Sequence, residues 1–139
     1  MVKSCLVPVG KLNGKKVQTV EGLAAPGDMT VVQKAFQKAG ASQCGYCIPG
    51  MVMAATSALQ ENPHPDREEI KEKLGGNICR CTGYQKIFDA VELARDVLNG
   101  KLSSSVFDDV EATDGKYIGQ NVRSEEYTSE LQSLRHLVC

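Results

Sequence analysis

The chain has 139 residues, a formal net charge of −1 and no tryptophan. This near-neutral charge gives no basic patch of the kind that nucleic acid requires, and no apolar run is long enough to cross a bilayer. The length suits one domain with parts of its neighbours. Because only 5% of the residues are aromatic, we expect a core of small aliphatic side chains.

The first 23 residues predict one or two β-strands. Residues 6–9 and 16–20 are the candidate strands, and Asn13-Gly14 between them is typical of a hairpin turn. Two strands alone are marginal in water, so this segment is expected to belong to a larger sheet.

Apolar residues at helical spacing predict two helices in the next part of the chain. The first covers about residues 30–39 and ends at Gly40. The second covers about residues 49–60, with Pro49 at its first position, where the missing N–H group costs nothing.

Two further helices are predicted after a proline-rich break. Asp66 and Glu69 have the spacing of a capping box at the start of a helix over residues 67–74. A fourth helix covers about residues 84–99, and Thr82 is a candidate for its N-cap. The glycines near the cysteines are expected at positive φ or at close backbone approaches.

The C-terminal part has a different composition. Residues 101–116 are rich in Ser, Asp and Glu and predict a solvated linker. Residues 123–139 resemble a translated sequencing adapter, so we expect a non-native tail that does not contribute to the fold. The alternative is a polar helix, because leucines recur there at helical spacing. A non-native tail would exclude Cys139 from any metal site.

Four cysteines form two close pairs, Cys44 with Cys47 and Cys79 with Cys81, and each pair directly precedes a predicted helix. Two thiol pairs brought together by a fold can bind either a tetrahedral zinc ion or a 2Fe-2S cluster. The adjacent helix N-termini favour the anionic cluster, and Arg80 adds a cation. A zinc-stabilised structural or interaction module without redox activity is the alternative.

The segment from Gln43 to Val91 resembles the helical 2Fe-2S domain of the xanthine oxidase family of molybdenum hydroxylases. The resemblance rests on Gln-Cys-Gly-Tyr-Cys-Ile-Pro-Gly-Met at residues 43–51 and Asn-Ile-Cys-Arg-Cys-Thr-Gly-Tyr-Gln at residues 77–85. It implies that Gln43 and Cys81 lie on the side of a molybdopterin cofactor. The cluster ligands that it implies are Cys44, Cys47, Cys79 and Cys81.

The N-terminus resembles the end of a plant-type ferredoxin domain from the same family. The matching residues are Ser-Cys-Leu-Val-Pro at 4–8 and Thr-Val-Glu-Gly-Leu at 19–23. The resemblance implies that Cys5 is the last ligand of a second 2Fe-2S cluster, whose other ligands are missing from this chain. The chain is therefore expected to be a fragment, in which residues 1–24 are the remnant of that domain.

The resulting fold class is mainly α: a four-helix 2Fe-2S-binding bundle over residues 25–100, preceded by a remnant of a β-grasp ferredoxin-type domain. Residues 101–122 are expected to form a linker and, from Asp114 to Val122, the start of a molybdenum-binding portion. That last segment resembles bacterial aldehyde oxidoreductases, in which the iron-sulfur and molybdenum parts share one chain.

The resemblance also implies a function. A molybdenum-pterin centre in a neighbouring domain or subunit would oxidise aldehydes or N-heterocycles, and electrons would pass through this cluster to the ferredoxin-type cluster. The next carrier would be FAD in a separate flavoprotein subunit, or an external acceptor. No catalytic acid, base or nucleophile is expected in this chain, and neither nucleic acid nor membrane is an expected partner. The expected location is cytoplasmic.

Overall fold

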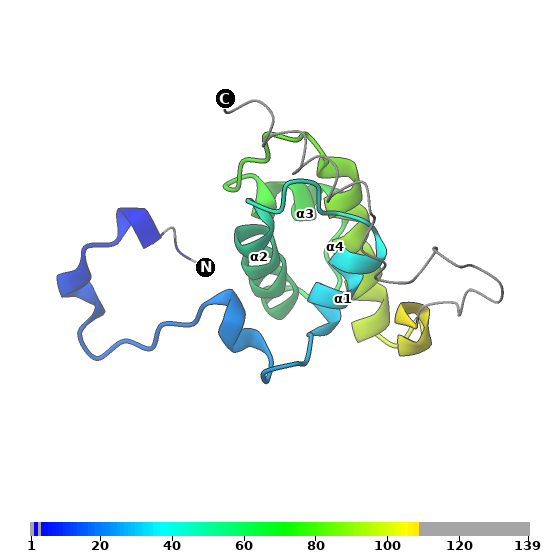
Figure 1. The fold of residues 1–139 in the computed structure, drawn as a ribbon, viewed down its shortest axis with the longest axis horizontal. Coiled ribbons are helices and arrows are strands. Elements are labelled where there is room, and N and C mark those ends of the chain that lie inside the picture. Colours follow the sequence, from blue (N-terminus) through cyan, green and yellow to red (C-terminus); the bar gives the residue numbers. More distant parts are fainter. Residues whose placement is uncertain (1, 3, 109–139) are drawn as a thin grey trace, which may run out of the picture. The chain divides into compact units, whose positions relative to one another are not determined.

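The computed structural model describes residues 2 and 4–108. Within this part the chain forms four α-helices, α1 to α4, and four short 3₁₀ helices, η1 to η4 (Figure 1). The chain divides into two units, residues 1–107 and 108–139, and all of these helices lie in the first. None of the described helices is both long and apolar enough to span a bilayer.

Helix α1, Val31–Lys38, begins with a full capping box. The Thr30 hydroxyl accepts the N–H of Gln33 at 3.2 Å, and the Gln33 side chain accepts the N–H of Thr30 at 2.7 Å. These two bonds satisfy donors that would otherwise lack a partner at the helix start. Gly40, with φ of 60°, follows the helix, as predicted.

Helix α2, Ile48–Glu61, has Cys47 as its N-cap residue. Pro49 is therefore the second residue of the helix rather than the predicted first. Both positions tolerate proline, because the N–H groups of the first turn have no acceptor within the helix.

Helix α3, Arg67–Leu74, has the predicted bounds and the predicted capping box. Asp66 accepts the N–H of Glu69 at 2.8 Å, and Glu69 accepts the N–H of Asp66 at 3.1 Å. Because Asp66 and Glu69 also place negative charge at the helix N-terminus, they stabilise its dipole as well as its free N–H groups.

Helix α4, Tyr84–Leu98, starts after Gly83, so the predicted N-cap at Thr82 is wrong. Thr82 has φ of 61°, and its hydroxyl donates instead to the carbonyl oxygen of Cys81 at 2.7 Å. The Thr82 hydroxyl therefore stabilises the turn before the helix, and the N-terminus of α4 has no side-chain cap.

The four α-helices pack around one aliphatic core, in which α1 contacts α4 most extensively and α2 contacts α3 (Figure 1). Alanines at the helix contacts let the backbones approach closely, as the low aromatic content predicts. The main buried residues are Val32, Ala35, Phe36, Met51, Val52, Ala54, Ala55, Ile70, Leu74, Ile87, Ala90, Val91 and Ala94.

Arg67 joins α3 to α4. Its guanidinium pairs with Asp89 at 2.7 Å and with Glu92, and lies 5.8 Å from the centre of the Phe88 ring. Exposed ion pairs of this kind contribute little individually, but the three contacts together fix the angle at which α3 meets α4.

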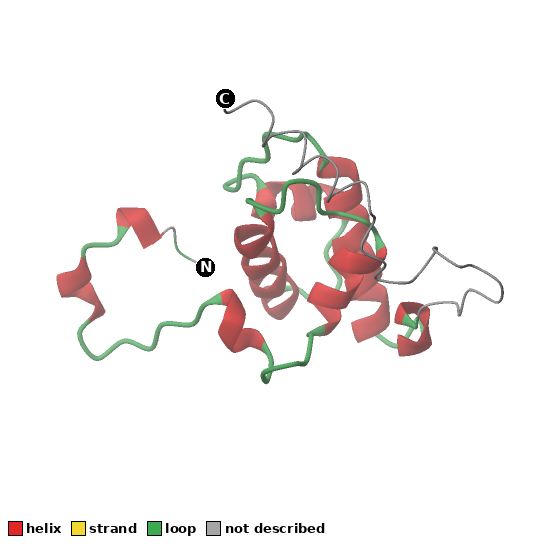
Figure 2. Cartoon of the chain, in the orientation of Figure 1, coloured by secondary structure: helices red, strands yellow, loops and turns green. Residues whose placement is uncertain are grey.

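The predicted N-terminal strands are wrong: the described residues contain no strand (Figure 2). The segment forms the 3₁₀ helices η1 (Ser4–Leu6), η2 (Val9–Leu12) and η3 (Val20–Leu23) instead. A strand needs a neighbour to accept its backbone hydrogen bonds, and the described part of the chain supplies none. The β-grasp remnant of the predicted fold class is thus without support, whereas the mainly α bundle is confirmed.

The predicted linker is partly ordered. Residues 104–107 form η4, Ser104–Phe107, which contacts α1, and Phe107 packs against the bundle core. Residues 109–116 of the linker, the expected molybdenum-binding start and the expected tail at 123–139 lie outside the described residues.

Candidate metal centre

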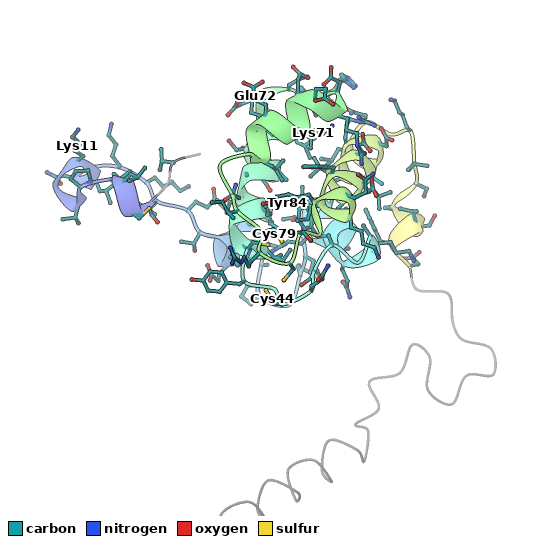
Figure 3. All side chains as sticks on the ribbon, turned by 90° about the horizontal axis from the view of Figure 1, so that it is seen from above. Lys11, Cys44, Lys71, Glu72, Cys79 and Tyr84 are labelled. Carbon is teal, nitrogen blue, oxygen red and sulfur yellow. The ribbon has the colours of Figure 1, made fainter. Side chains whose placement is uncertain are left out.

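The two cysteine pairs lie on two loops of the same bundle. Cys44 and Cys47 belong to the loop from α1 to α2, and Cys79 and Cys81 to the loop from α3 to α4. Cys44, Cys79 and Tyr84 gather on one side, away from Lys71 and Glu72 on α3 (Figure 3). Residues more than thirty positions apart in the sequence are thereby brought together.

The four thiols contact one another in pairs that cross between the loops. The Cys81 thiol donates to the sulfur of Cys44, and the Cys47 thiol donates to the sulfur of Cys79. Cys79 also interacts electrostatically with Cys44 and Cys81. No group of three or more Cys, His, Asp or Glu side chains in residues 2 and 4–108 has the arrangement that holds a single metal ion.

In the first pair, the Cys44 thiol is exposed and the Cys47 thiol is half-buried. The backbone N–H of Tyr46 and the Cys81 thiol stabilise the Cys44 thiolate, so the pKa of Cys44 lies below its usual value. Burial, together with the hydrogen bond to Cys79, raises the pKa of Cys47 to about 11. The half-buried thiol is thus the harder of the two to ionise.

The second pair also combines a lowered with a raised pKa, but here the lowered pKa belongs to the more buried thiol. Cys79 is buried, yet the backbone N–H of Gly83 donates to its sulfur and holds its pKa below the usual value. The backbone of Cys44 lowers the pKa of Cys81, but the Cys44 thiol, burial and the nearby thiolates outweigh this effect and raise it.

Backbone N–H groups converge on these sulfurs. Tyr46 donates to Cys44, Gly83 and Thr82 donate to Cys79, and Cys44 donates to Cys81. Hydrogen bonds from amides to sulfur stabilise the negative charge of thiolate-bound iron and set its reduction potential.

Backbone conformation at two positions makes these contacts possible. Gly45 has φ of 82°, as the expectation for this turn required, and only glycine adopts it freely. Thr82 adopts φ of 61° although it is β-branched, a conformation that costs about 1–3 kcal/mol. Strain of this size is tolerated at positions where the surrounding structure fixes a functional loop.

The helices that follow the cysteine loops differ from the other two at their N-termini. Helices α1 and α3 have capping boxes, whereas no side chain caps α2 or α4. The positive dipole ends of α2 and α4 therefore have no capping side chain and remain available for an anion beside the four sulfurs. In α2 the Ile48 N–H already donates to the Gly45 carbonyl oxygen at 3.2 Å, and Pro49 has no N–H group.

These features fit a thiolate-bound iron-sulfur cluster. The donors are four thiols, with no carboxylate or imidazole among them, and the side-chain Nδ2 of Asn77, two residues before Cys79, is buried without a partner. A Cβ on Gly50 would lie 2.7 Å from Oδ1 of Asn77, so this loop lies directly against the first turn of α2. Gly50 and Gly83 thus provide space rather than positive φ.

Gln43 and Cys5 occupy different settings. Gln43 is exposed, and its Nε2 lies 3.2 Å from the position that a Cβ on Gly83 would occupy, so its side chain reaches from one cysteine loop to the other. Cys5 is exposed in η1. Neither residue's predicted cofactor contact is tested by this geometry.

Sequence reasoning missed two residues of the site. Tyr84 was recognised only as part of a motif, yet its hydroxyl accepts the N–H of Cys79 at 2.7 Å. Asn77 precedes the second cysteine pair and has no pattern of its own. The only available signal was their position within a few residues of the cysteines.

Comparison with known proteins identifies the family. Residues 19–92 match the family described as the 2Fe-2S binding domain. The chain belongs to this family. The match covers all four paired cysteines and the helices that position them, which confirms the resemblance found in the sequence.

Relatives of the 2Fe-2S binding domain are subunits of oxidoreductases. The chain is 45% identical over 93 residues to the nicotinate dehydrogenase small FeS subunit of Eubacterium barkeri, covering 67% of the chain and 59% of that protein. It is 47% identical over 90 residues to the nicotine 6-hydroxylase small subunit of Paenarthrobacter nicotinovorans, covering 65% of the chain and 54% of that protein. The chain thus spans just over half the length of these relatives.

Solved structures share the fold. Quinoline 2-oxidoreductase from Pseudomonas putida 86 matches with a TM-score of 0.64 and 39% identity, over 73% of this chain and 64% of that one. Aldehyde oxidoreductase from Desulfovibrio gigas matches with a TM-score of 0.64 and 37% identity, over 70% of this chain and 11% of that one.

Proposed function

We propose that the bundle is an electron-transfer domain of a molybdenum hydroxylase and holds one 2Fe-2S cluster. Its ligands are Cys44, Cys47, Cys79 and Cys81. The observation that carries the proposal is the meeting of these thiols beside two uncapped helix N-termini, in a chain that belongs to the 2Fe-2S binding domain family.

Each part of the site has a distinct task. When bound, the cluster accepts and releases one electron at a time. The thiolates hold the iron, while the N–H groups of Tyr46, Gly83 and Thr82 stabilise negative charge on sulfur. Buried Cys79 and half-buried Cys47 exclude water from one side, and exposed Cys44 leaves the other accessible.

The proposed electron path follows from the family resemblance of the sequence. Gln43 and Cys81 face the molybdopterin, which lies in a neighbouring molybdenum-binding domain or subunit. Cys5 ligates a second 2Fe-2S cluster in a ferredoxin-type domain, whose remaining ligands this chain lacks. Electrons then reach FAD in a flavoprotein subunit or an external acceptor, in a cytoplasmic enzyme.

The substrate is an aldehyde or an N-heterocycle. This class is supported by the names of similar proteins, which include nicotinate dehydrogenase, nicotine 6-hydroxylase, quinoline 2-oxidoreductase and aldehyde oxidoreductase. The substrate pocket itself belongs to the molybdenum-binding part.

Absorbance and metal analysis test the proposal. Anaerobically reconstituted protein should be brown, contain iron and inorganic sulfide, and bleach with dithionite. A zinc module, which four thiols could also form, would be colourless and would contain zinc.

Single alanine variants test the ligand set. Replacing Cys44, Cys47, Cys79 or Cys81 should prevent cluster retention and loosen the bundle, because metal-binding free energy is also folding free energy. Cys5→Ala is the matched control and should retain the bundle's cluster. Equal loss of iron in all five variants would refute the assignment of Cys5 to a separate cluster.

A further inference from the structure

One hydrogen bond ties the start of α4 to the buried cysteine. The hydroxyl oxygen of Tyr84, the first residue of α4, accepts the backbone N–H of Cys79 at 2.7 Å. Both side chains lie on the cysteine side of the bundle (Figure 3). Cys79 is the one buried cysteine among the described residues, so this N–H group has no ready access to water as an alternative acceptor.

The Tyr84 ring is held in place from two helices. It stacks on Phe88 of α4, with 6.1 Å between the ring centres and 29° between the planes. Phe88 in turn lies beneath the guanidinium of Arg67 on α3. A phenolic oxygen held this way is a fixed acceptor, because moving it would disturb the ring contacts as well.

The hydrogen bond to Tyr84 also determines which backbone N–H groups point toward the Cys79 sulfur. The N–H groups of Gly83, Cys81 and Thr82 donate to the Cys79 sulfur, whereas the N–H of Cys79 itself is committed to oxygen. Each amide directed at a cluster sulfur stabilises the more negative, reduced form. Tyr84 therefore removes one donor from the set that would raise the reduction potential.

We propose that Tyr84 is a positioning residue for the cluster: it fixes the buried ligand Cys79 and keeps that residue's N–H away from sulfur. The inference rests on the proposed function, since it concerns the same four-thiolate site. Tyr84 is not a ligand, and its effect is transmitted through the backbone of Cys79.

The test compares two substitutions that each remove one hydroxyl. Tyr84→Phe removes the acceptor, and the control Ser57→Ala removes a hydroxyl that donates to Glu61 at 3.2 Å within α2, outside both cysteine loops. Both variants are made in the complete protein loaded with its clusters. The midpoint potential is measured by EPR-monitored titration, and cluster loss is followed under an iron chelator.

Tyr84→Phe should shift the midpoint potential of this cluster to a more positive value. The freed N–H can turn toward sulfur, and any water that enters the loosened loop also stabilises the reduced form. Cluster loss should be roughly fivefold faster, the factor that corresponds to about 1 kcal/mol for a buried hydrogen bond. Ser57→Ala should change neither quantity.

A ring-fluorinated tyrosine at position 84 keeps the ring and hydroxyl but makes the oxygen a weaker acceptor. It should shift the potential in the same direction, and it covers the case in which Tyr84→Phe does not fold. An unchanged potential in the fluorinated protein, or equal shifts in Tyr84→Phe and Ser57→Ala, would overturn the inference alone. Failure of the unsubstituted protein to take up a cluster would overturn the proposed function as well.

Discussion

Replacing Gly50 with alanine should destabilise the apoprotein, although alanine is the better helix former. A Cβ at position 50 would lie 2.7 Å from Oδ1 of Asn77, closer than such atoms approach in folded proteins. Gly50 lies in the first turn of α2, and Asn77 precedes Cys79 by two residues. The substitution must therefore displace the partly buried Asn77 side chain, the start of α2 or the second cysteine loop.

Two opposing effects set the magnitude. Overpacking costs about 1–3 kcal/mol, whereas replacing glycine by alanine in a helix gains up to about 1 kcal/mol. The net expectation for Gly50→Ala is a loss of about 1 kcal/mol. Asn77→Ala removes the obstructing amide together with its unpartnered Nδ2, so in that background only the helical gain remains. The coupling between the two sites should be about 2 kcal/mol.

Urea unfolding of the reduced apoprotein, followed by far-UV circular dichroism, measures all four members of this cycle. Gly10→Ala is the control, because a Cβ there would meet nothing within 4 Å. Its effect should be small. If Gly50→Ala changes the free energy of unfolding equally with and without Asn77, the contact does not limit the site and the steric reasoning fails.

Two further expectations concern the thiols and the C-terminus. In the apoprotein, Cys44 should be alkylated by iodoacetamide well before Cys47, because Cys44 is exposed with a lowered pKa while the pKa of Cys47 is raised to about 11. Peptide mass spectrometry at mildly alkaline pH measures the order, and faster labelling of Cys47 would contradict it. Deleting residues 123–139 should leave the melting temperature and iron content unchanged; a substantial loss of either would show that the segment is structural.

The helical bundle could be predicted from sequence because the apolar spacing that favours each helix also forms the face that the helix buries. Apolar residues at helical spacing supplied the buried faces, and Asp66 with Glu69 marked the start of α3 within the sequence itself. The strands predicted for residues 6–9 and 16–20 failed because a strand depends on a neighbouring strand, and residues 2 and 4–108 contain none.

The site could be predicted only in part. The spacing of the two cysteine pairs placed them before helices, which the structure bears out for α2 and α4. The contact of Gly50 with Asn77 joins residues 27 positions apart, and the bond from Cys79 to Tyr84 depends on a loop whose path turns at strained Thr82. Neither the spacing nor the residue types encode such a path.

The helix starts show why the cysteine loops lack ordinary caps. Thr30 and Asp66 have extended backbones, with ψ of 162° and 175°, from which a side-chain oxygen reaches the N–H groups of the first turn. Cys47 and Gly83 have ψ of −15° and 26°, so a side chain at either position points elsewhere. The uncapped N-termini of α2 and α4 are therefore a property of the loop backbones rather than of the residues alone.

This argument predicts that serine cannot act as a cap in place of Cys47. Apoproteins with Cys47→Ser and Cys47→Ala should unfold within about 0.5 kcal/mol of each other, because the serine hydroxyl cannot reach the N–H groups of α2. At Asp66, whose backbone permits capping, serine should be more stable than alanine by about 1 kcal/mol. Urea unfolding of the four variants measures both differences. A gain of about 1 kcal/mol for serine over alanine at position 47 that persists with Cys79→Ala, which removes the sulfur that this residue contacts, would show that the loop backbone does not prevent capping.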